Sequence, residues 1–180
     1  IMSSLKSNDI HTDVLILDMD WHWNGNDYSM SAGRGGWTGW SWNTNLIPDP
    51  VGLLKEIHGN NLKTALNLHP ADGINSTESP EFFEEMNEYL RGKYDVKGSS
   101  DKTIPWYLDY PDFTNAFFST IIREHEKEGV DFWWLDWQQH LTSPYTNGMG
   151  QTFWCNHVFF NDMAKNRPDH RPLIFHRWGG

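Results

Sequence analysis

Residues 129–137 read GVDFWWLDW, a glycine followed by an apolar and aromatic run that contains the acid Asp136. The run from Val130 to Trp137 is continuous and short enough for a buried strand. Before it, Thr114–Glu128 has the spacing of an amphipathic helix, and Gly129 suits the left-handed turn that ends one. A helix that passes directly into a buried strand is typical of α/β proteins. The stretch also raises a question, because a carboxylate among tryptophans costs several kcal/mol unless a partner holds it.

The same alternation of helix and strand extends along the chain. Further buried strands are predicted at Asp13–Trp21, Leu62–His69 and Leu173–Arg177. Further helices are predicted over residues 1–9, from Asp49-Pro50 to Gly59, from Ser79-Pro80 to Leu90 and over Thr152–Asn166, with a loop over residues 92–111. This order predicts a parallel sheet with right-handed crossovers.

Four strands are half of the number in a (β/α)8 barrel, which takes roughly 250 residues. We therefore predict an α/β fold that is about half of such a TIM barrel. It would form a single partial catalytic domain over residues 1–180, truncated at both ends, since an open four-stranded sheet leaves bare edges that natural proteins avoid. A doubly wound, flavodoxin-like sheet is the alternative. Against it, the first strand is not followed by a phosphate-binding glycine turn that leads straight into a helix.

Polar residues stand at the end of every predicted strand. Asp18 and Asp20 end the first, His69 the second, Asp136 the third and Arg177 the fourth. In a (β/α) barrel the carboxyl ends of all strands open onto one face, where active sites lie, so we expect these side chains to meet in one cleft. The plainer interpretations are that the first two aspartates cap turns, that His69 is a hydrogen-bonded core residue and that Arg177 is a structural ion-pair partner.

Aromatic residues are abundant, with 11 Trp, 6 Tyr and 10 Phe. Tryptophan combines a large apolar face with one N–H donor, which suits sugar rings rimmed by hydroxyls, although any one tryptophan can simply fill core. We expect the walls of the cleft to include Trp133, Trp134 or Trp137. The glycine-rich stretch Gly33–Asn43 follows the first strand and is expected to bring its tryptophans over the same face. These are Trp37, Trp40 and Trp42, of which Trp42 is the predicted substrate contact.

Composition excludes several classes of partner. The net charge of −10 and the pI of about 5.2 argue against nucleic acid or an anionic membrane, since both attract basic surfaces. No apolar run is long enough to span a bilayer. Cys155 is the single cysteine, so neither an intramolecular disulfide nor a cysteine-based metal site is expected, and the compartment stays open.

No cofactor and no metal site are predicted. A zinc hydrolase is a minor alternative, because the sequence has no His-x-His or His-x-x-x-His pair to anchor the ion. The ligands in that alternative would be His22, His69, His176 and Asp18.

The set of strand-end residues suits glycoside cleavage, which commonly uses two carboxyl groups that flank the bond. In the retaining mechanism one attacks the anomeric carbon, and the other protonates the leaving oxygen and then activates water. Asp136 is the candidate nucleophile. Arg177 would keep neighbouring acids ionised, because an opposite charge lowers a carboxylate pKa, and Asp18 would accept hydrogen bonds from sugar hydroxyls.

Motifs in the same order resemble those of glycoside hydrolase family 31 over nearly the whole chain. They are Asp13–Asp20 (DVLILDMD), Leu46–Pro50 (LIPDP), Leu62–Pro70, Pro111–Asn115 (PDFTN), Gly129–Asp136 and the arginine of Phe175-His176-Arg177. The resemblance implies that Asp136 is the nucleophile and Trp134 a wall of the sugar subsite. It also implies that Asp18 binds hydroxyls of the non-reducing sugar and that Arg177 is a further contact. An aspartate at the position of Asp20 goes with hexosidases, whereas xylosidases tend to carry an aromatic residue there.

Two features depart from the family pattern. The family's common Asp-Met-Asn-Glu is Asp136-Trp137-Gln138-Gln139 here, so an α-galactosidase or an α-N-acetylgalactosaminidase is an alternative to an α-glucosidase. The family's acid/base aspartate follows the arginine strand, beyond Gly180. We therefore expect the 180 residues on their own not to turn over substrate.

The first hypothesis is thus a retaining α-glycoside hydrolase, preferably an α-glucosidase, that cleaves terminal α-linked hexosides through a covalent glycosyl–aspartate intermediate. The second is a carbohydrate-binding barrel fragment in which the tryptophan-lined cleft persists without catalysis. Both imply an oligosaccharide or glycoside as partner, and the open sheet edges predict pairing with another copy. The expected substrate contacts are Asp18, Asp20, Trp42, His69, Trp134 and Arg177.

Overall fold

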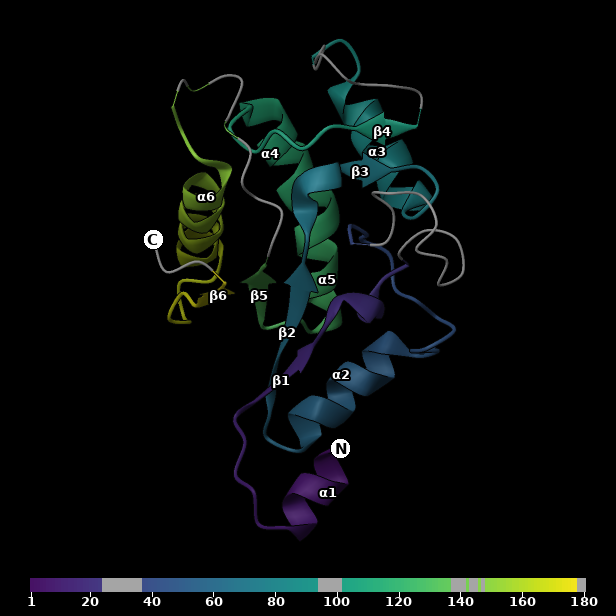
Figure 1. The fold of residues 1–180 in the computed structure, drawn as a ribbon, viewed down its shortest axis with the longest axis vertical. Coiled ribbons are helices and arrows are strands. Elements are labelled where there is room, and N and C mark those ends of the chain that lie inside the picture. Colours follow the sequence, from purple (N-terminus) through teal and green to yellow (C-terminus); the bar gives the residue numbers. More distant parts are fainter. Residues whose placement is uncertain (24–36, 94–101, 137–141, 143–145, 147, 178–180) are drawn as a thin grey trace.

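The computed structural model of the chain describes residues 1–23, 37–93, 102–136, 142, 146 and 148–177. Four parallel strands form its main sheet: β1 (Val14–Leu17), β2 (Lys63–Leu68), β5 (Phe132–Leu135) and β6 (Ile174–His176). Their order across the sheet is β1-β2-β5-β6, and each neighbouring pair is parallel. Helices connect successive strands, so the predicted parallel sheet with crossover helices is confirmed (Figure 1).

Two predicted features lie outside the described residues. One is the Trp137-Gln138-Gln139 sequence that follows the third predicted strand. The other is the first part of the glycine-rich stretch, residues 33–36.

The helices lie close to the predicted ranges. They are α1 (Met2–Ser7), α2 (Pro50–Gly59), α3 (Pro80–Leu90), α4 (Pro111–Phe117), α5 (Arg123–Glu128) and α6 (Gln151–Asn166). Asp49 caps α2 by accepting a 2.9 Å hydrogen bond from the N–H of Gly52, as its position predicts. The left-handed residue after α2 is Asn61, with φ 60°, and not Gly59, which lies inside the helix. None of the helices in the described ranges is long and apolar enough to cross a membrane.

The helix predicted over Thr114–Glu128 is continuous but has a wider turn at its middle. A π-helical turn over Phe118–Ile122 joins α4 to α5, and such a turn shifts the side chains that follow it around the helix axis. Gly129 ends α5 with φ 127°, as predicted. A Cβ on this glycine would also touch the side chains of Leu54 and His58 on α2 at 3.4 Å, so the helix end packs closely on its neighbour.

A small two-stranded sheet lies over the carboxyl end of β2. β3 (Ile74–Asn75) pairs antiparallel with β4 (Thr103–Ile104), and Figure 1 shows both beside α3, above the tip of β2. β4 lies in the segment predicted as a loop, so that prediction was wrong for these two residues. Strands of two residues carry no alternating pattern, and this pairing joins residues 28 positions apart, so periodicity does not reveal it.

The sheet has an outer face covered by helices and an inner face turned away from them. Trp133 points outward, where its ring lies 6.5 Å from Phe159 of α6 and 6.3 Å from His125 of α5. Trp134 points inward because successive side chains of a strand alternate, and its ring lies 5.3 Å from that of Phe175. In a (β/α) barrel the helices form the outer ring, so the face that carries Trp134 corresponds to the barrel interior.

The alternation also decides where the strand-end side chains point. Register places Asn67 beside Trp134 and Trp134 beside Phe175. Asp136 follows Trp134 by two residues, and Arg177 follows Phe175 by two, so both continue on the inner face. The polar residues at the strand ends therefore emerge on the same side of the sheet.

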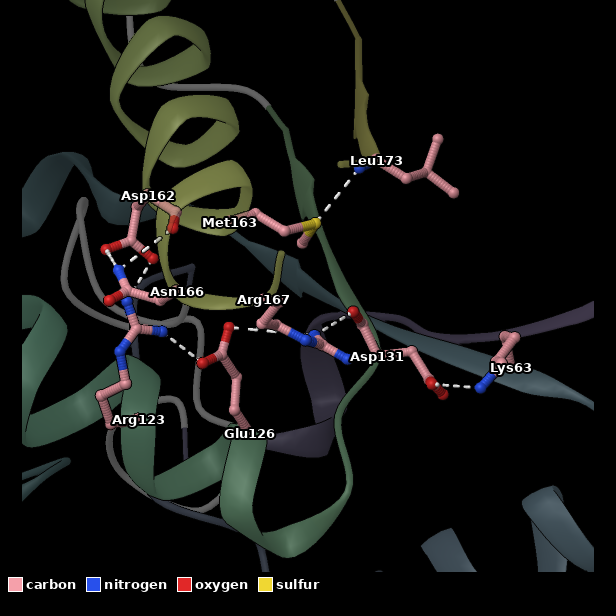
Figure 2. Close-up of polar contacts among 9 residues, drawn as sticks. All are labelled: Lys63, Arg123, Glu126, Asp131, Asp162, Met163, Asn166, Arg167 and Leu173. Carbon is pink, nitrogen blue, oxygen red and sulfur yellow. Dashed lines mark hydrogen bonds and ion pairs between the residues drawn. The ribbon is translucent and has the colours of Figure 1, made fainter. Parts of the chain in front are cut away.

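Ionic contacts fasten α5, α6 and β5 at the amino end of β5, as Figure 2 shows. Arg123 of α5 contacts both Glu126 and Asp162, so one guanidinium joins α5 to α6. Arg167, just after α6, donates a 2.6 Å hydrogen bond to the backbone carbonyl of Asp131 and lies 3.9 Å from Glu126. These contacts link α5 to α6, and the end of α6 to the residue before β5.

The carboxylate of Asp131 joins three elements at this end of the sheet. It accepts hydrogen bonds from the ammonium of Lys63 and the N–H of Thr64, both at 2.9 Å, and its Oδ2 lies 2.8 Å from Nε2 of His58 on α2. Burial alone would raise the pKa of Asp131. The hydrogen bonds from Lys63, Thr64 and His58 outweigh burial and hold the pKa below its usual value.

We expect Asp131→Asn to lower the free energy of unfolding at neutral pH by about 1.5–3 kcal/mol, the range for hydrogen bonds to a charged group. Because the folded-state pKa is depressed, this contribution is present above the unfolded pKa of about 3.9 and is lost as the pH falls through the folded pKa. Urea unfolding of both proteins from about pH 7 down to about pH 3 measures the change.

The exposed Asp169→Asn serves as the control and should unfold like the wild type at each pH. A difference between D131N and the wild type that stays constant as the pH falls would contradict the role given to the carboxylate.

Candidate active site

A pocket of about 620 Å³ opens at the carboxyl ends of the strands. This volume is within the range of small-ligand sites. The lining residues lie at or just after the carboxyl ends of β1, β2, β5 and β6, except for Trp37, which lies farther along the segment between β1 and α2. They are Asp18, Met19, Asp20, Trp37, His69, Trp134, Asp136 and Arg177.

Asp136 is the most enclosed of the pocket acids, with 2% of its surface exposed. Its N–H extends the sheet by donating a 3.0 Å hydrogen bond to the carbonyl of Leu68. Its Oδ2 accepts a 2.8 Å hydrogen bond from the side-chain amide of Asn67, and its Oδ1 accepts one from Nε of Arg177. Nε2 of His69 lies 3.4 Å from Oδ2. The carboxylate among tryptophans is therefore held by donors from the two strands on either side, which offsets the cost of burying it.

Arg177 connects the two edges of the sheet electrostatically. The hydrogen bond and the charge of Asp136 raise the pKa of Arg177 above its usual value, and the charge of Asp18 adds to the effect. Asp18 follows β1 and Arg177 follows β6, which are the first and last strands of the sheet. Two side chains from opposite edges can share one pocket only if the sheet curves, as a barrel wall does.

Asp18 and Asp20 both line the pocket but do not lie on a strand. β1 ends at Leu17, and a 3₁₀ turn over Met19–Trp21 follows. Oδ1 of Asp18 accepts a 2.7 Å hydrogen bond from the N–H of Met19, so it caps this turn while its residue faces the pocket. The capping and the binding interpretations of Asp18 are therefore compatible.

His69 and Trp134 both line the pocket. His69 is buried, its carbonyl accepts a hydrogen bond from the hydroxyl of Thr38, and its ring lies 5.2 Å from that of Trp37. Within the described residues the indole N–H of Trp134 is buried without a hydrogen-bond partner. A buried donor beside a pocket costs free energy until an acceptor reaches it, and a ligand oxygen can supply that acceptor.

Trp42, the predicted substrate contact, is not among the residues that line the pocket. Its indole N–H donates a 2.7 Å hydrogen bond to Glu128 of α5, and its ring packs 5.0 Å from Trp21 and 5.8 Å from His125. An antiparallel bridge to His22 holds its backbone. The chain after the pocket thus turns back over α5 and buries Trp42 in the core.

Of the three tryptophans expected over this face, Trp37 lines the pocket, whereas Trp40 and Trp42 are buried in the core. Sequence reasoning did not single out one further side chain that matters to the pocket. Asn67 is fully buried and reaches Asp136, although it was not proposed as a site residue. A signal for Asn67 existed: it is a polar residue inside the otherwise apolar end of a strand, two residues before His69 and so on the same face.

The histidines of the zinc alternative do not gather. His22 is fully buried, and neither it nor His176 is among the pocket-lining residues. In the part of the chain that the structure describes, no group of three or more His, Cys, Asp or Glu side chains is arranged to hold a metal ion.

Comparison with known proteins identifies the family. A model of the glycosyl hydrolases family 31 TIM-barrel domain matches residues 1–180. The chain belongs to glycoside hydrolase family 31. Its fold is accordingly part of a TIM barrel, as the sequence predicted. No curated protein matches the family 31 chain significantly.

Several solved structures share the fold. A family 31 sulfoquinovosidase from E. rectale, in complex with an aza-sugar inhibitor, has a TM-score of 0.65 and 18% identity and covers 99% of this chain and 28% of its own. The cycloalternan-degrading enzyme from Trueperella pyogenes, in complex with isomaltose, has a TM-score of 0.59 and 15% identity, with 99% and 29% covered. The α-galactosidase from Lactobacillus brevis has a TM-score of 0.53 and 13% identity, with 98% and 23% covered. The family 31 chain thus spans less than a third of each of these proteins, and at such identities the similarity concerns the fold.

Because Trp37 lines the pocket and Trp42 lies in the core, the same substitution should affect ligand affinity at Trp37 and stability at Trp42. Trp37→Phe should weaken the binding of a glucose-configured aza-sugar by roughly 3–10-fold, the value of one aromatic contact, with little change in stability. Trp42→Phe should lower the free energy of unfolding by about 1.5–3 kcal/mol, because it removes a donor to a carboxylate. Isothermal titration and urea unfolding of both variants measure the two effects, and equal losses of affinity in both variants would contradict this placement.

Proposed function

We propose that this chain is part of the catalytic barrel domain of a retaining α-glycosidase in which Asp136 is the nucleophile. The observation that carries the proposal is the setting of Asp136, a buried carboxylate at the pocket with a donor on each oxygen. Hydrogen bonds to the charged form favour ionisation, and a nucleophilic carboxylate must be ionised. Membership of glycoside hydrolase family 31 supports the same assignment.

In the proposed reaction an oxygen of Asp136 attacks the anomeric carbon. A C–O bond to the enzyme forms while the bond to the leaving oxygen breaks, and a second carboxyl group protonates that oxygen. Water, deprotonated by the same group, then releases the sugar from Asp136. Arg177 and Asn67 would orient the attacking carboxylate. By the family resemblance, the second carboxyl group comes from a strand that follows Arg177.

An uncharged hexose suits the pocket better than an anionic sugar. Three carboxylates line the pocket, those of Asp18, Asp20 and Asp136, against the one guanidinium of Arg177 among the described residues. A sulfonated sugar would bring a further negative charge to this surplus, which like-charge repulsion opposes. The exposed carboxylates of Asp18 and Asp20 can instead accept hydrogen bonds from several hydroxyls, which favours an α-glucoside.

Galactose-configured substrates stay as the alternative specificity within the same proposal. A panel of aryl α-glucoside, α-galactoside, α-N-acetylgalactosaminide, α-xyloside and α-sulfoquinovoside substrates separates these possibilities. We expect the highest kcat/KM for the glucoside, and a preference for the sulfoquinovoside would overturn the electrostatic reasoning.

The pairing of sheet edges β1 and β6 with another copy stays a prediction.

In the protein that carries this chain, Asp136→Asn should reduce hydrolysis of an aryl α-glucoside by about 10⁴-fold, the size of effect when one member of a catalytic set is lost. A 5-fluoroglycosyl fluoride should label Asp136, and mass spectrometry of the peptide locates the adduct. The exposed Asp169→Asn is the matched control and should be fully active.

A wild-type protein that binds glucosides but neither hydrolyses them nor becomes labelled would support the carbohydrate-binding alternative instead. A label on a different carboxylate would reject the assignment of Asp136.

Asn67→Leu keeps the approximate volume of the side chain and removes the donor to Asp136. We expect kcat/KM to fall by roughly 10–100-fold, the equivalent of a hydrogen bond to a charged group, while the protein stays folded. The exposed Asn161→Leu on α6 is the control. Steady-state kinetics and circular dichroism of both variants test this, and unchanged kcat/KM in folded N67L would show that Asn67 does not hold the nucleophile.

A further inference from the structure

A buried histidine on α5 contacts two hydrogen-bond acceptors. His125 is 1% exposed, and its Nδ1 lies 2.8 Å from Oε2 of Glu128, while its Nε2 lies 2.7 Å from the backbone carbonyl oxygen of Trp40. A carbonyl oxygen and an ionised carboxylate can only accept hydrogen bonds. Both ring nitrogens must therefore donate, and an imidazole ring donates from both only as the imidazolium cation.

The carboxylate beside His125 is ionised. Partial burial alone would raise the pKa of Glu128, but hydrogen bonds from His125 and from the indole of Trp42 outweigh burial and lower it. Glu128 therefore supplies a negative charge at neutral pH, and His125 and Glu128 form a charge-assisted pair in the interior.

Aromatic rings and one further histidine surround His125. The ring centroids of Trp21, Trp42 and Phe82 lie 5.2, 5.8 and 5.5 Å from that of His125, and each ring is steeply inclined to it. The nearby His22 is neutral at pH 7, because burial lowers the pKa of His22 to about 4, with smaller lowering contributions from the charges of His69 and His125. His22 therefore adds no second positive charge beside His125.

His125 holds the middle of a segment whose first residue reaches the pocket. We call residues 37–43 the aromatic loop. Trp37 lines the pocket, and only Thr38 and Gly39 separate it from Trp40, whose carbonyl His125 binds. Gly39 packs so tightly that a Cβ there would overlap the ring of His22. The contact at Trp40 thus lies three residues from the pocket wall.

Hydrogen bonds to several other elements hold the rest of the loop. The hydroxyl of Thr38 donates to the carbonyl of His69. The N–H of Trp40 donates to the hydroxyl of Ser79 at 2.9 Å, and its indole donates to the carbonyl of Gly73 at 2.9 Å. Ser41 donates to Glu81 of α3, and Trp42 donates to Glu128. Among the described residues, the ion pair that contacts the loop is that of His125 and Glu128.

We propose that His125, as a buried imidazolium, is a positioning residue that fixes the aromatic loop on α5 and thereby sets the place of Trp37 in the pocket. A ring nitrogen without a proton would face an acceptor with its lone pair, which is repulsive, so weakening the pair of His125 and Glu128 should loosen the loop. Ligand affinity should then fall. The proposal rests on the proposed function only for the expectation that the ligand is a sugar.

The titratable and charged groups that face His125 are few in the described parts of the chain. Glu128 lies on its own helix, and His22 follows β1. The contacts from α3 and β5 are the aromatic rings of Phe82 and Trp133. In these parts of the chain, Glu128 is the charged partner of His125.

The charge state is tested first, without substrate, by ¹⁵N NMR of the protein labelled in its histidine rings. We expect both ring nitrogens of His125, assigned with the variant His125→Gln, to carry protons at neutral pH. A single-proton, neutral ring at neutral pH in the wild type would overturn the proposal. Because the wild type carries this measurement, a failure of the variant to fold leaves it valid, and His125 is then assigned by its contact to Glu128 in ring spectra.

The coupling to the pocket is tested with a matched pair on the same helix, Glu128→Gln and the exposed Glu124→Gln. In protein carrying 5-fluorotryptophan, the ¹⁹F signal of Trp37, assigned with Trp37→Phe, should shift in E128Q and stay in place in E124Q. Affinity for a glucose-configured aza-sugar should fall by roughly 5-fold or more in E128Q, the lower end of typical coupling between sites.

Equal behaviour of E128Q and E124Q, in the Trp37 signal or in affinity, would refute the coupling. A protein without glycosidase activity in which the Trp37 signal still shifts in E128Q but not in E124Q would reject the proposed function and leave this inference intact.

Discussion

The burial of one carboxylate between two neighbouring strands is the constraint on which the pocket depends. Asp136 loses nearly all contact with water, so its charge is tolerable only if donors reach both oxygens. Asn67 on β2 and Arg177 after β6 supply them from either side of β5. This arrangement requires the three strands to be parallel and in the observed register, because a slip of one residue would turn each side chain to the opposite face. The strand register and the curvature of the sheet therefore determine the electrostatics of the pocket.

The two ends of the sheet carry different kinds of ionic contact. At the amino ends, Asp131 and Arg123 pair with groups on neighbouring strands and helices, and these pairs close the structure without forming part of the pocket. At the carboxyl ends, charged groups face a pocket, and two of the acids stay exposed. This division is the one expected of a (β/α) barrel, in which one face stabilises and the other binds. Substitutions at the amino ends of the strands can therefore alter stability with little effect on the pocket at the carboxyl ends.

Much of this arrangement could be predicted from the sequence, because parallel topology places all strand ends on one face. Asp18, His69, Asp136 and Arg177 are far apart in the chain, yet all four line the pocket. The loops were harder, since neither period nor strand direction fixes which residue of a glycine-rich segment faces a cleft. Trp37 and Trp42 have the same side chain but different neighbours. The ring of Trp37 packs against that of His69, whereas the indole N–H of Trp42 donates to Glu128. The two-stranded sheet of β3 and β4 was missed for a related reason: its strands are too short to show an alternation of apolar and polar residues.

The position of Asp18 and Arg177 on the outermost strands has a consequence for any bound sugar. A ligand that touches both would link the first and last strands of the described sheet, so occupancy of the pocket and curvature of the sheet become thermodynamically linked. Bound ligand at a concentration 100 times Kd adds about 2.7 kcal/mol to the folded state. In this geometry that free energy would act across the whole width of the described sheet rather than on one loop, so a ligand in the pocket would stabilise the sheet as well as the site.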